Sequence, residues 1–352
     1  MLQRKTLMML IGGILACCLL VSLIALPVLV SPANEWMFKA TQIDALHALG
    51  LDGAGITIGL IGTGVDSTHP EFDSETITLW VDLVNNQEQP YDDADHGTHL
   101  AALLVGKGSY TGLLSGVHLK GIAPEVDLVV IKAVSVAESE FGYGDDSRIA
   151  QAIVLCIEES VDIICLDLGL HPSKFFENGW ILTKQAINQA TNQGILVICP
   201  AGDDGLYDDA DVAVPGTLPL VISVGSVNKQ GMVSLFSSRG RQHPETLHPH
   251  KKPELVAPGE ALLSARVSSS YGVMSGTTHA AVVVAGVVAL LIQAYPRLPM
   301  LYEGDLLIHL IKDVLAQTGS RQEFGMALRH NDYQGYGCIQ AYDAYVQLAL
   351  YI

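Results

Sequence analysis

Positive charge is scarce in this sequence of 352 residues. It contains 19 lysine and arginine residues against 37 aspartate and glutamate residues, so its formal net charge at pH 7 is −18. Binding to nucleic-acid phosphates needs a basic surface, and we therefore expect no nucleic-acid partner. The glycines at positions 59, 62 and 64 lack the G-x-G-x-x-G spacing of dinucleotide-binding loops, so we expect no nucleotide either.

Cysteine pairs with metal-binding spacing are also missing. Two of the six cysteines, Cys17 and Cys18, lie in an apolar N-terminal segment. The other four are Cys156, Cys165, Cys199 and Cys338, and the first three of these sit in apolar runs. We therefore expect buried free thiols, and no disulfide framework, metal or cofactor.

Two weaker metal-binding alternatives remain open. Five aspartates crowd the stretch from Asp203 to Asp211, where a solvated acidic loop is the main expectation and a cation site is the alternative. A metal held by His96, His279 and Asp203 is also conceivable, but no local ligand spacing supports it.

The N-terminal segment Leu7–Val30 has no charged residue and follows Arg4 and Lys5. Its length suffices for a membrane span, and the basic residues before it favour a cytoplasmic N-terminus. The small residues of Ser31-Pro32-Ala33 offer a cleavage site, so residues 1–33 are either a signal anchor or a cleaved signal peptide. Both interpretations export residues 34–352, which we expect to form one domain without room for a folded prosegment.

Continuous apolar runs alternate with helical patterns through the rest of the chain. Hydrophobic residues make up 49% of the sequence and charged residues only 16%, which is typical of a well-buried core. The pattern predicts strands at residues 56–61, 128–131, 163–166, 195–198 and 220–224, with helices at 96–105, 147–158 and 180–193. Unbroken apolar strands separated by helices indicate an α/β fold with a parallel sheet covered on both faces. The very apolar segment 277–295, which ends before Pro296, is predicted to be a buried central helix.

Three short motifs, in a fixed order, carry the chemical signal. They are Gly62-Thr63-Gly64-Val65-Asp66, His96-Gly97-Thr98-His99 and Ser275-Gly276-Thr277-Thr278. Framework segments accompany them at residues 121–124, 236–240, 257–259 and 335–337. Together they resemble the subtilisin-like serine proteases (subtilases) over residues 41–347. This resemblance implies a three-layer α/β/α fold, a mainly parallel sheet and a catalytic triad in the order Asp, His, Ser.

Carried over residue by residue, the resemblance gives an altered active site. His96 takes the general-base position, and Thr278 takes the nucleophile position. Gly62 stands at the aspartate position, so that acid is lost, and Asp203 replaces the asparagine of the oxyanion hole. The strand that lines the substrate corresponds to Asp167, Leu168 and Gly169.

Each replacement predicts a loss of catalytic power. Glycine neither orients nor stabilises the imidazole, and loss of the triad aspartate costs about 3 × 10⁴ in turnover in subtilisin. The methyl group of Thr278 restricts rotation about χ1, and an ionised Asp203 accepts hydrogen bonds instead of donating them. Asp66, Asp95 and Asp203 are candidate substitute acids for His96, and we expect none of them to restore function.

We therefore predict an exported pseudoprotease that binds a peptide or protein ligand in the former substrate cleft. One alternative is a weak or altered serine-type endopeptidase that uses Thr278 and His96. Another is a structural or assembly protein with an occluded cleft. The acid at Asp167 suggests a preference for a basic side chain in the ligand.

Overall fold

The computed structural model describes seven stretches of the chain. These are residues 34–110, 119–136, 145–169, 180–207, 212–240, 251–320 and 330–352. The predicted membrane or signal segment Leu7–Val30, its cleavage site and the acidic residues 208–211 lie outside the described residues.

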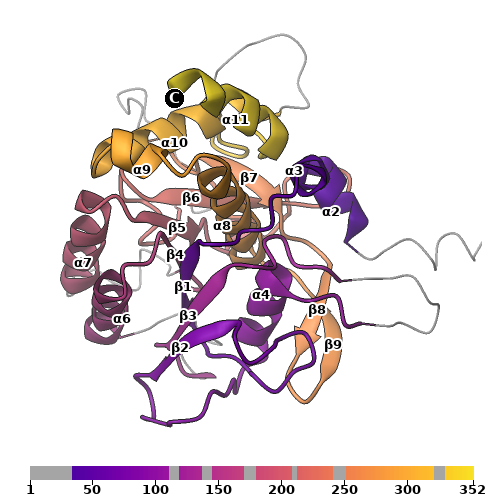
Figure 1. Ribbon diagram of the computed structural model, residues 1–352, viewed down its shortest axis with the longest axis vertical. Helices are drawn as coiled ribbons and strands as arrows, with labels where there is room; N and C mark the ends of the chain where they lie inside the picture. Colours follow the sequence, from indigo (N-terminus) through magenta and orange to yellow (C-terminus); the bar gives the residue numbers. More distant parts are fainter. Residues whose placement is uncertain are drawn as a thin grey trace, which may run out of the picture.

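A seven-stranded parallel sheet forms the middle layer (Figure 1). Its strand order is β2-β3-β1-β4-β5-β6-β7, and every neighbouring pair is parallel. The strands are β1 (Thr57–Gly62), β2 (Ile77–Asp82), β3 (Asp127–Lys132), β4 (Ile163–Leu166), β5 (Leu196–Pro200), β6 (Ile222–Val227) and β7 (Leu255–Pro258). All residues of β4, β5, β6 and β7 are buried, and the unbroken apolar runs predicted the first three of these strands.

Helices cover both faces of this sheet, each over its own hydrophobic core (Figure 1). On one face lie α6 (Asp146–Glu158) and α7 (Ile181–Asn192). On the other lie α4 (His96–Val105), α8 (Thr277–Ala294), α10 (Asp305–Thr318) and α11 (Ala341–Leu348). The shorter elements are α2 (Glu35–Ala40), α3 (Ile43–Ala48), α9 (Leu298–Leu301), the 3₁₀ turns η2 (Gly205–Tyr207) and η3 (Ala349–Tyr351), and the antiparallel hairpin of β8 (Leu262–Arg266) and β9 (Ser270–Met274). The predicted three-layer α/β/α fold is confirmed.

Helix α8 is the buried central helix that the sequence predicted. Every residue from Thr277 to Ile292 is buried. Among the described residues it is the one helix long and apolar enough to cross a membrane, but 89% of it lies inside the protein. Gly286 lets it approach the segment after α4, because a Cβ atom there would lie 2.4 Å from Cγ2 of Ile122.

The strand order reverses beside β1, whose neighbours in the sheet are β3 and β4. At such a switch point, the loops after the carboxyl ends of adjacent strands diverge and leave room for a site. Gly62 ends β1 and Asp167 directly follows β4 at this point. The amino ends of α4 and α8 bring His96 and Thr278 to the same edge.

Two buried histidines join α4, α8 and the hairpin. Nε2 of His279 on α8 lies 3.1 Å from Nδ1 of His99 on α4, and Nε2 of His99 lies 3.0 Å from the carbonyl oxygen of Gly272 on β9. Burial lowers the pKa of His99 to about 4 and that of His279 well below its ordinary value. Both rings are therefore neutral near pH 7.

We expect this histidine pair to make the fold sensitive to acid. The folded-state pKa of His99 is depressed, so its contribution to stability is complete above the unfolded value of 6.5 and is lost as pH falls toward 4. For this fully buried ring the loss amounts to about 3 kcal/mol in the free energy of unfolding. Urea unfolding of the wild type and of His99→Gln between pH 7 and pH 4 tests it. The variant should lose less stability than the wild type over this range, and equal losses would contradict the assignment.

Candidate active site

His96 is the first residue of α4, and hydrogen bonds fasten this end of the helix to β1. Gly97 N–H donates to Oγ1 of Thr63 at 2.9 Å, and Thr98 N–H donates to a carboxylate oxygen of Asp92 at 2.8 Å. Gly97 also packs on the backbone after β1, since a Cβ there would lie 2.1 Å from the carbonyl oxygen of Gly64. The imidazole of His96 is thereby held over the end of β1, with 25% of its side chain exposed.

Thr278 lies in the first turn of α8, and its hydroxyl faces His96. Oγ1 of Thr278 is 3.2 Å from Nε2 of His96, which is within hydrogen-bond reach. Thr278 is only 8% exposed. The structure therefore brings together the two residues that the sequence placed at the base and nucleophile positions.

Asp167 contacts the other nitrogen of the His96 imidazole. Its Oδ1 atom lies 2.7 Å from Nδ1 of His96, and its side chain is fully buried. The two groups form an ion pair when His96 is protonated, and the direction of the contact departs from that of a linear hydrogen bond. A carboxylate, an imidazole and a hydroxyl thus form one chain of contacts: Asp167, His96 and Thr278.

Gly62 makes room for this carboxylate. A Cβ atom at Gly62 would lie 2.4 Å from Oδ2 and 2.6 Å from Cβ of Asp167. The two positions are adjacent because Ile61 and Leu166 are register partners in the parallel strands β1 and β4. A side chain at position 62 and the carboxylate of Asp167 therefore exclude each other.

The structure here differs from the sequence-based expectation. The sequence predicts that His96 has no carboxylate partner, because the aspartate position holds Gly62, and that Asp167 contacts the substrate. Instead Asp167 points to His96 and has no exposed side-chain surface. The signal for this existed in the sequence, because an acid missing at the end of one strand coincides with an acid gained at the end of its neighbour.

The three acids that the sequence offered as substitutes have other partners. Asp66 accepts the backbone N–H of Ser268 at 2.9 Å, and Asp95 forms an ion pair with Arg266. Asp203 accepts the backbone N–H of Thr277 at 2.8 Å. The structure assigns none of them to Nδ1 of His96.

The charges of Asp167 and His96 shift each other's protonation. Burial disfavours the imidazolium of His96, but the neighbouring Asp167 carboxylate outweighs this and raises the pKa of His96 above its ordinary value. Burial also raises the pKa of Asp167, although attraction to His96 opposes that shift. The pair stabilises the protonated base that forms during general-base catalysis.

Asp203 lies beside the nucleophile, where the resemblance placed an oxyanion donor. A Cβ atom at Gly276 would lie 2.9 Å from Oγ1 of Thr278, 3.1 Å from Oδ2 of Asp203 and 3.2 Å from Nδ1 of His279. The three polar atoms therefore surround one small niche. Burial raises the pKa of Asp203, which favours the neutral carboxyl group, and that form donates a hydrogen bond.

The remaining predicted substrate residues follow β4. Leu168 is 6% exposed, and Gly169 packs near Pro200 and Ala213. Their contact with a substrate stays a prediction. Within the described residues, no cluster of three or more His, Cys, Asp or Glu side chains is arranged to hold a metal ion.

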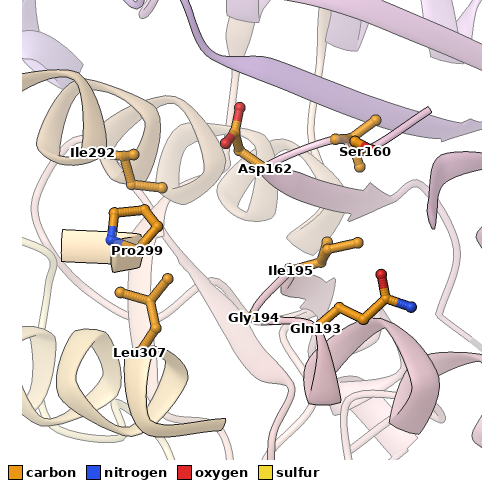
Figure 2. Close-up of a pocket in the computed structure, with 9 residues that line it drawn as sticks. Ser160, Asp162, Gln193, Gly194, Ile195, Ile292, Pro299 and Leu307 are labelled. Atoms are coloured by element: carbon orange, nitrogen blue, oxygen red, sulfur yellow. The ribbon is translucent and has the colours of Figure 1, made fainter. Parts of the chain in front are cut away.

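A separate pocket lies at the other end of the strands from His96, beside the amino ends of β4 and β5 (Figure 2). Its lining includes Asp162, Gln193, Ile292 and Leu307. Because the strands are parallel, this pocket is remote from His96 and Thr278, and it belongs to neither the base nor the nucleophile.

This chain is similar in sequence and in fold to known proteins. The profile described as Subtilase family matches residues 53–337. Serine protease AprX of Bacillus subtilis is 31% identical over 276 residues, which is 70% of this chain and 59% of AprX, and the major intracellular serine protease of the same organism is 32% identical over 258 residues, with 72% and 73% covered. Two solved structures share the fold. The prenylagaramide maturation protease PagA has a TM-score of 0.68 at 22% identity, and the match covers 87% of this chain and 98% of PagA. The Clostridium perfringens CspB protease has a TM-score of 0.72 at 19% identity, and the match covers 89% of this chain and 99% of CspB. The two structures show the fold, and the profile together with the B. subtilis relatives shows that this chain belongs to the subtilase family.

Proposed function

We propose that this protein is a slow endopeptidase whose triad consists of Thr278, His96 and Asp167. The observation that carries the proposal is the 2.7 Å contact between Asp167 and His96 in the space that Gly62 leaves free. A buried carboxylate is costly unless it is paired, and here it is paired with the one group that a serine-type mechanism requires it to support.

The proposed reaction is acyl transfer from a peptide. Nε2 of His96 accepts the proton of the Thr278 hydroxyl while Oγ1 attacks the scissile carbonyl carbon. Asp167 directs the Nδ1–H group toward itself, which leaves the lone pair of Nε2 facing Thr278, and it stabilises the resulting imidazolium. His96 then gives this proton to the leaving amine, and a water molecule releases the acyl group by the same steps.

The developing oxyanion needs donors near the niche at Gly276. The first turn of α8 presents backbone N–H groups. Asp203 adds a donor only in its protonated form, which burial favours by raising its pKa. Ionised Asp203 would instead repel the oxyanion. The methyl group of Thr278 adds steric restriction at the attacking atom, so we propose a turnover well below that of a serine enzyme.

The runner-up is a pseudoprotease that binds a peptide or protein in the substrate site. The replacements at Thr278 and Asp203 favour it, because both weaken acyl transfer while leaving the surrounding framework. A structural or assembly role remains the third candidate. We also propose that the domain works outside the cytoplasm, because a long uncharged segment, Leu7–Val30, precedes it.

Covalent labelling tests the proposed nucleophile. We expect a fluorophosphonate probe to modify Thr278 of the purified full chain slowly, and to modify Thr278→Ser at least about tenfold faster, because serine lacks the methyl group. Thr278→Val, which keeps the shape and removes the hydroxyl, should not be labelled. Mass spectrometry of the peptide that contains residue 278 measures the rate. If neither the wild type nor Thr278→Ser reacts while both are folded, the peptidase proposal fails and saturable peptide binding would favour the pseudoprotease.

A double substitution tests whether the acid at position 167 takes the place of an acid at position 62. Asp167→Ser should lower the labelling rate by about 10⁴, as for other triad aspartates. Gly62→Asp alone should also fail, because its side chain would collide with Asp167. The pair Gly62→Asp with Asp167→Ser should recover at least about a hundredfold over either single variant. Restoring aspartate at position 62 is therefore expected to help only when Asp167 is removed.

Circular dichroism of the three variants separates loss of function from loss of fold. An active Gly62→Asp single variant would contradict the assigned role of Asp167.

The pH dependence of labelling tests the charge pair. General-base catalysis requires neutral His96, so the raised pKa of His96 places the acid limb of the rate profile above pH 6.5. Asp167→Asn should reduce the maximal rate and move this limb to lower pH, because the carboxylate that stabilises the imidazolium is gone. Asp203→Asn is the comparison, and it should move the limb less because Asp203 is hydrogen-bonded to Thr277 and influences the pKa of His96 less than Asp167 does. Equal shifts in the two variants would argue against a specific pair.

A further inference from the structure

The hydroxyl of Thr278 faces two imidazoles. Its Oγ1 atom lies 3.2 Å from Nε2 of His96 and 3.4 Å from Nδ1 of His279. His279 directly follows Thr278 on α8, and its ring meets that of His96 edge to face at a centroid distance of 5.3 Å. The triad described above does not account for this second imidazole.

The protonation of His279 follows from the carbonyl group of Gly272. A carbonyl oxygen only accepts hydrogen bonds, so Nε2 of His99, 3.0 Å away, carries the hydrogen. Neutral His99 then presents the lone pair of Nδ1, and Nε2–H of His279 donates to it at 3.1 Å. Neutral His279 therefore presents the lone pair of its own Nδ1 to Oγ1 of Thr278.

Burial makes this second acceptor more demanding than the first. The side chain of His96 is 25% exposed, so water can satisfy Nε2 if the Thr278 hydroxyl turns away. His279 is 1% exposed and depends on protein groups for hydrogen bonds. Oδ2 of Asp203 borders the same niche, but within the described residues it makes no hydrogen bond to His279.

The side chain of Thr278 can adopt more than one orientation. In a helix its side chain has two accessible χ1 rotamers, which place the hydroxyl and the methyl group differently. A rotamer that moves Oγ1 off its present site also leaves the buried Nδ1 atom of His279 without a partner. Such an unsatisfied buried acceptor is costly.

We propose that His279 is a positioning residue that selects the rotamer of Thr278 in which Oγ1 faces His96. This proposal rests on the proposed function. The hydroxyl has one hydrogen, which goes to Nδ1 of His279 while His96 is protonated and donates its own Nε2–H to Oγ1, and which turns to Nε2 of His96 when His96 is neutral. Oγ1 keeps the same place in both states, so His279 holds the oxygen on the catalytic side and keeps the methyl group out of that position. Serine at position 278 has no methyl group to exclude, so it depends less on His279. The effect of His279 therefore depends on residue 278 and is larger when that residue is threonine than when it is serine.

Nuclear magnetic resonance tests the positioning directly, whether or not the protein is active. In the full chain, ¹⁵N shifts should show His99 and His279 as Nε2–H tautomers at pH 7. Couplings of the Thr278 methyl carbon to the backbone should report one χ1 rotamer in the wild type and a mixture in His279→Leu. His279→Asn, whose side-chain oxygen retains an acceptor near the position of Nδ1, should keep one rotamer.

Labelling supplies the functional readout as a double-mutant cycle. His279→Leu should slow fluorophosphonate labelling by about tenfold when residue 278 is threonine and by less than about threefold in Thr278→Ser. His279→Asn should retain most of the wild-type rate. A merely structural role for His279 would slow the threonine and serine proteins equally.

Each result decides the proposal. An Nδ1–H tautomer of His279 in the wild type, an unchanged rotamer in His279→Leu or equal slowing in both backgrounds would overturn it. If His279→Leu does not fold, the wild-type tautomer and the His279→Asn rotamer still decide. If no chain is labelled although the rotamer responds as expected, the peptidase function fails while the positioning by His279 stands.

Discussion

The chemistry of this site depends on the ion pair between Asp167 and His96. It requires a glycine at the end of β1, an acid one position past the end of β4 and the parallel register that makes these positions neighbours. It also requires the amino end of α4 to hold the imidazole above them. Every other feature of the site, including the contact of Thr278 with Nε2, acquires a catalytic meaning only when Nδ1 is engaged by this carboxylate.

The site combines a rebuilt base with a weakened nucleophile. The acid is buried and lies against the imidazole, whereas the hydroxyl carries an extra methyl group and a carboxyl group stands where an amide is usual in the family. These features fit an enzyme in which slow acyl transfer is sufficient better than a site in which all catalytic contacts have decayed. The buried histidines behind Thr278 place a second hydrogen-bond acceptor beside the hydroxyl.

Much of this molecule was predictable from its sequence. The apolar runs predicted the parallel sheet, the segment 277–295 predicted the buried helix, and the motifs placed His96 and Thr278 together. The origin of the acid was missed because motif matching assigns a role to each position separately, while the role of Asp167 depends on the register between β1 and β4. The contacts of His279 were missed for a similar reason, since its partner His99 is 180 residues away and is joined to it only by the packing of α4 on α8.

The adjacency of β1 and β4 has a consequence for the order of catalytic residues along the chain. Subtilisin reads Asp, His, Ser, whereas the residues gathered here read His96, Asp167, Thr278, which is the sequence order of chymotrypsin on an unrelated fold. Moving an acid sideways by one strand thus permutes the linear order while the spatial constellation stays in place. A search that identifies active subtilases by a fixed order of residues would pass over such a chain, and one that compares neighbouring strand ends would find it.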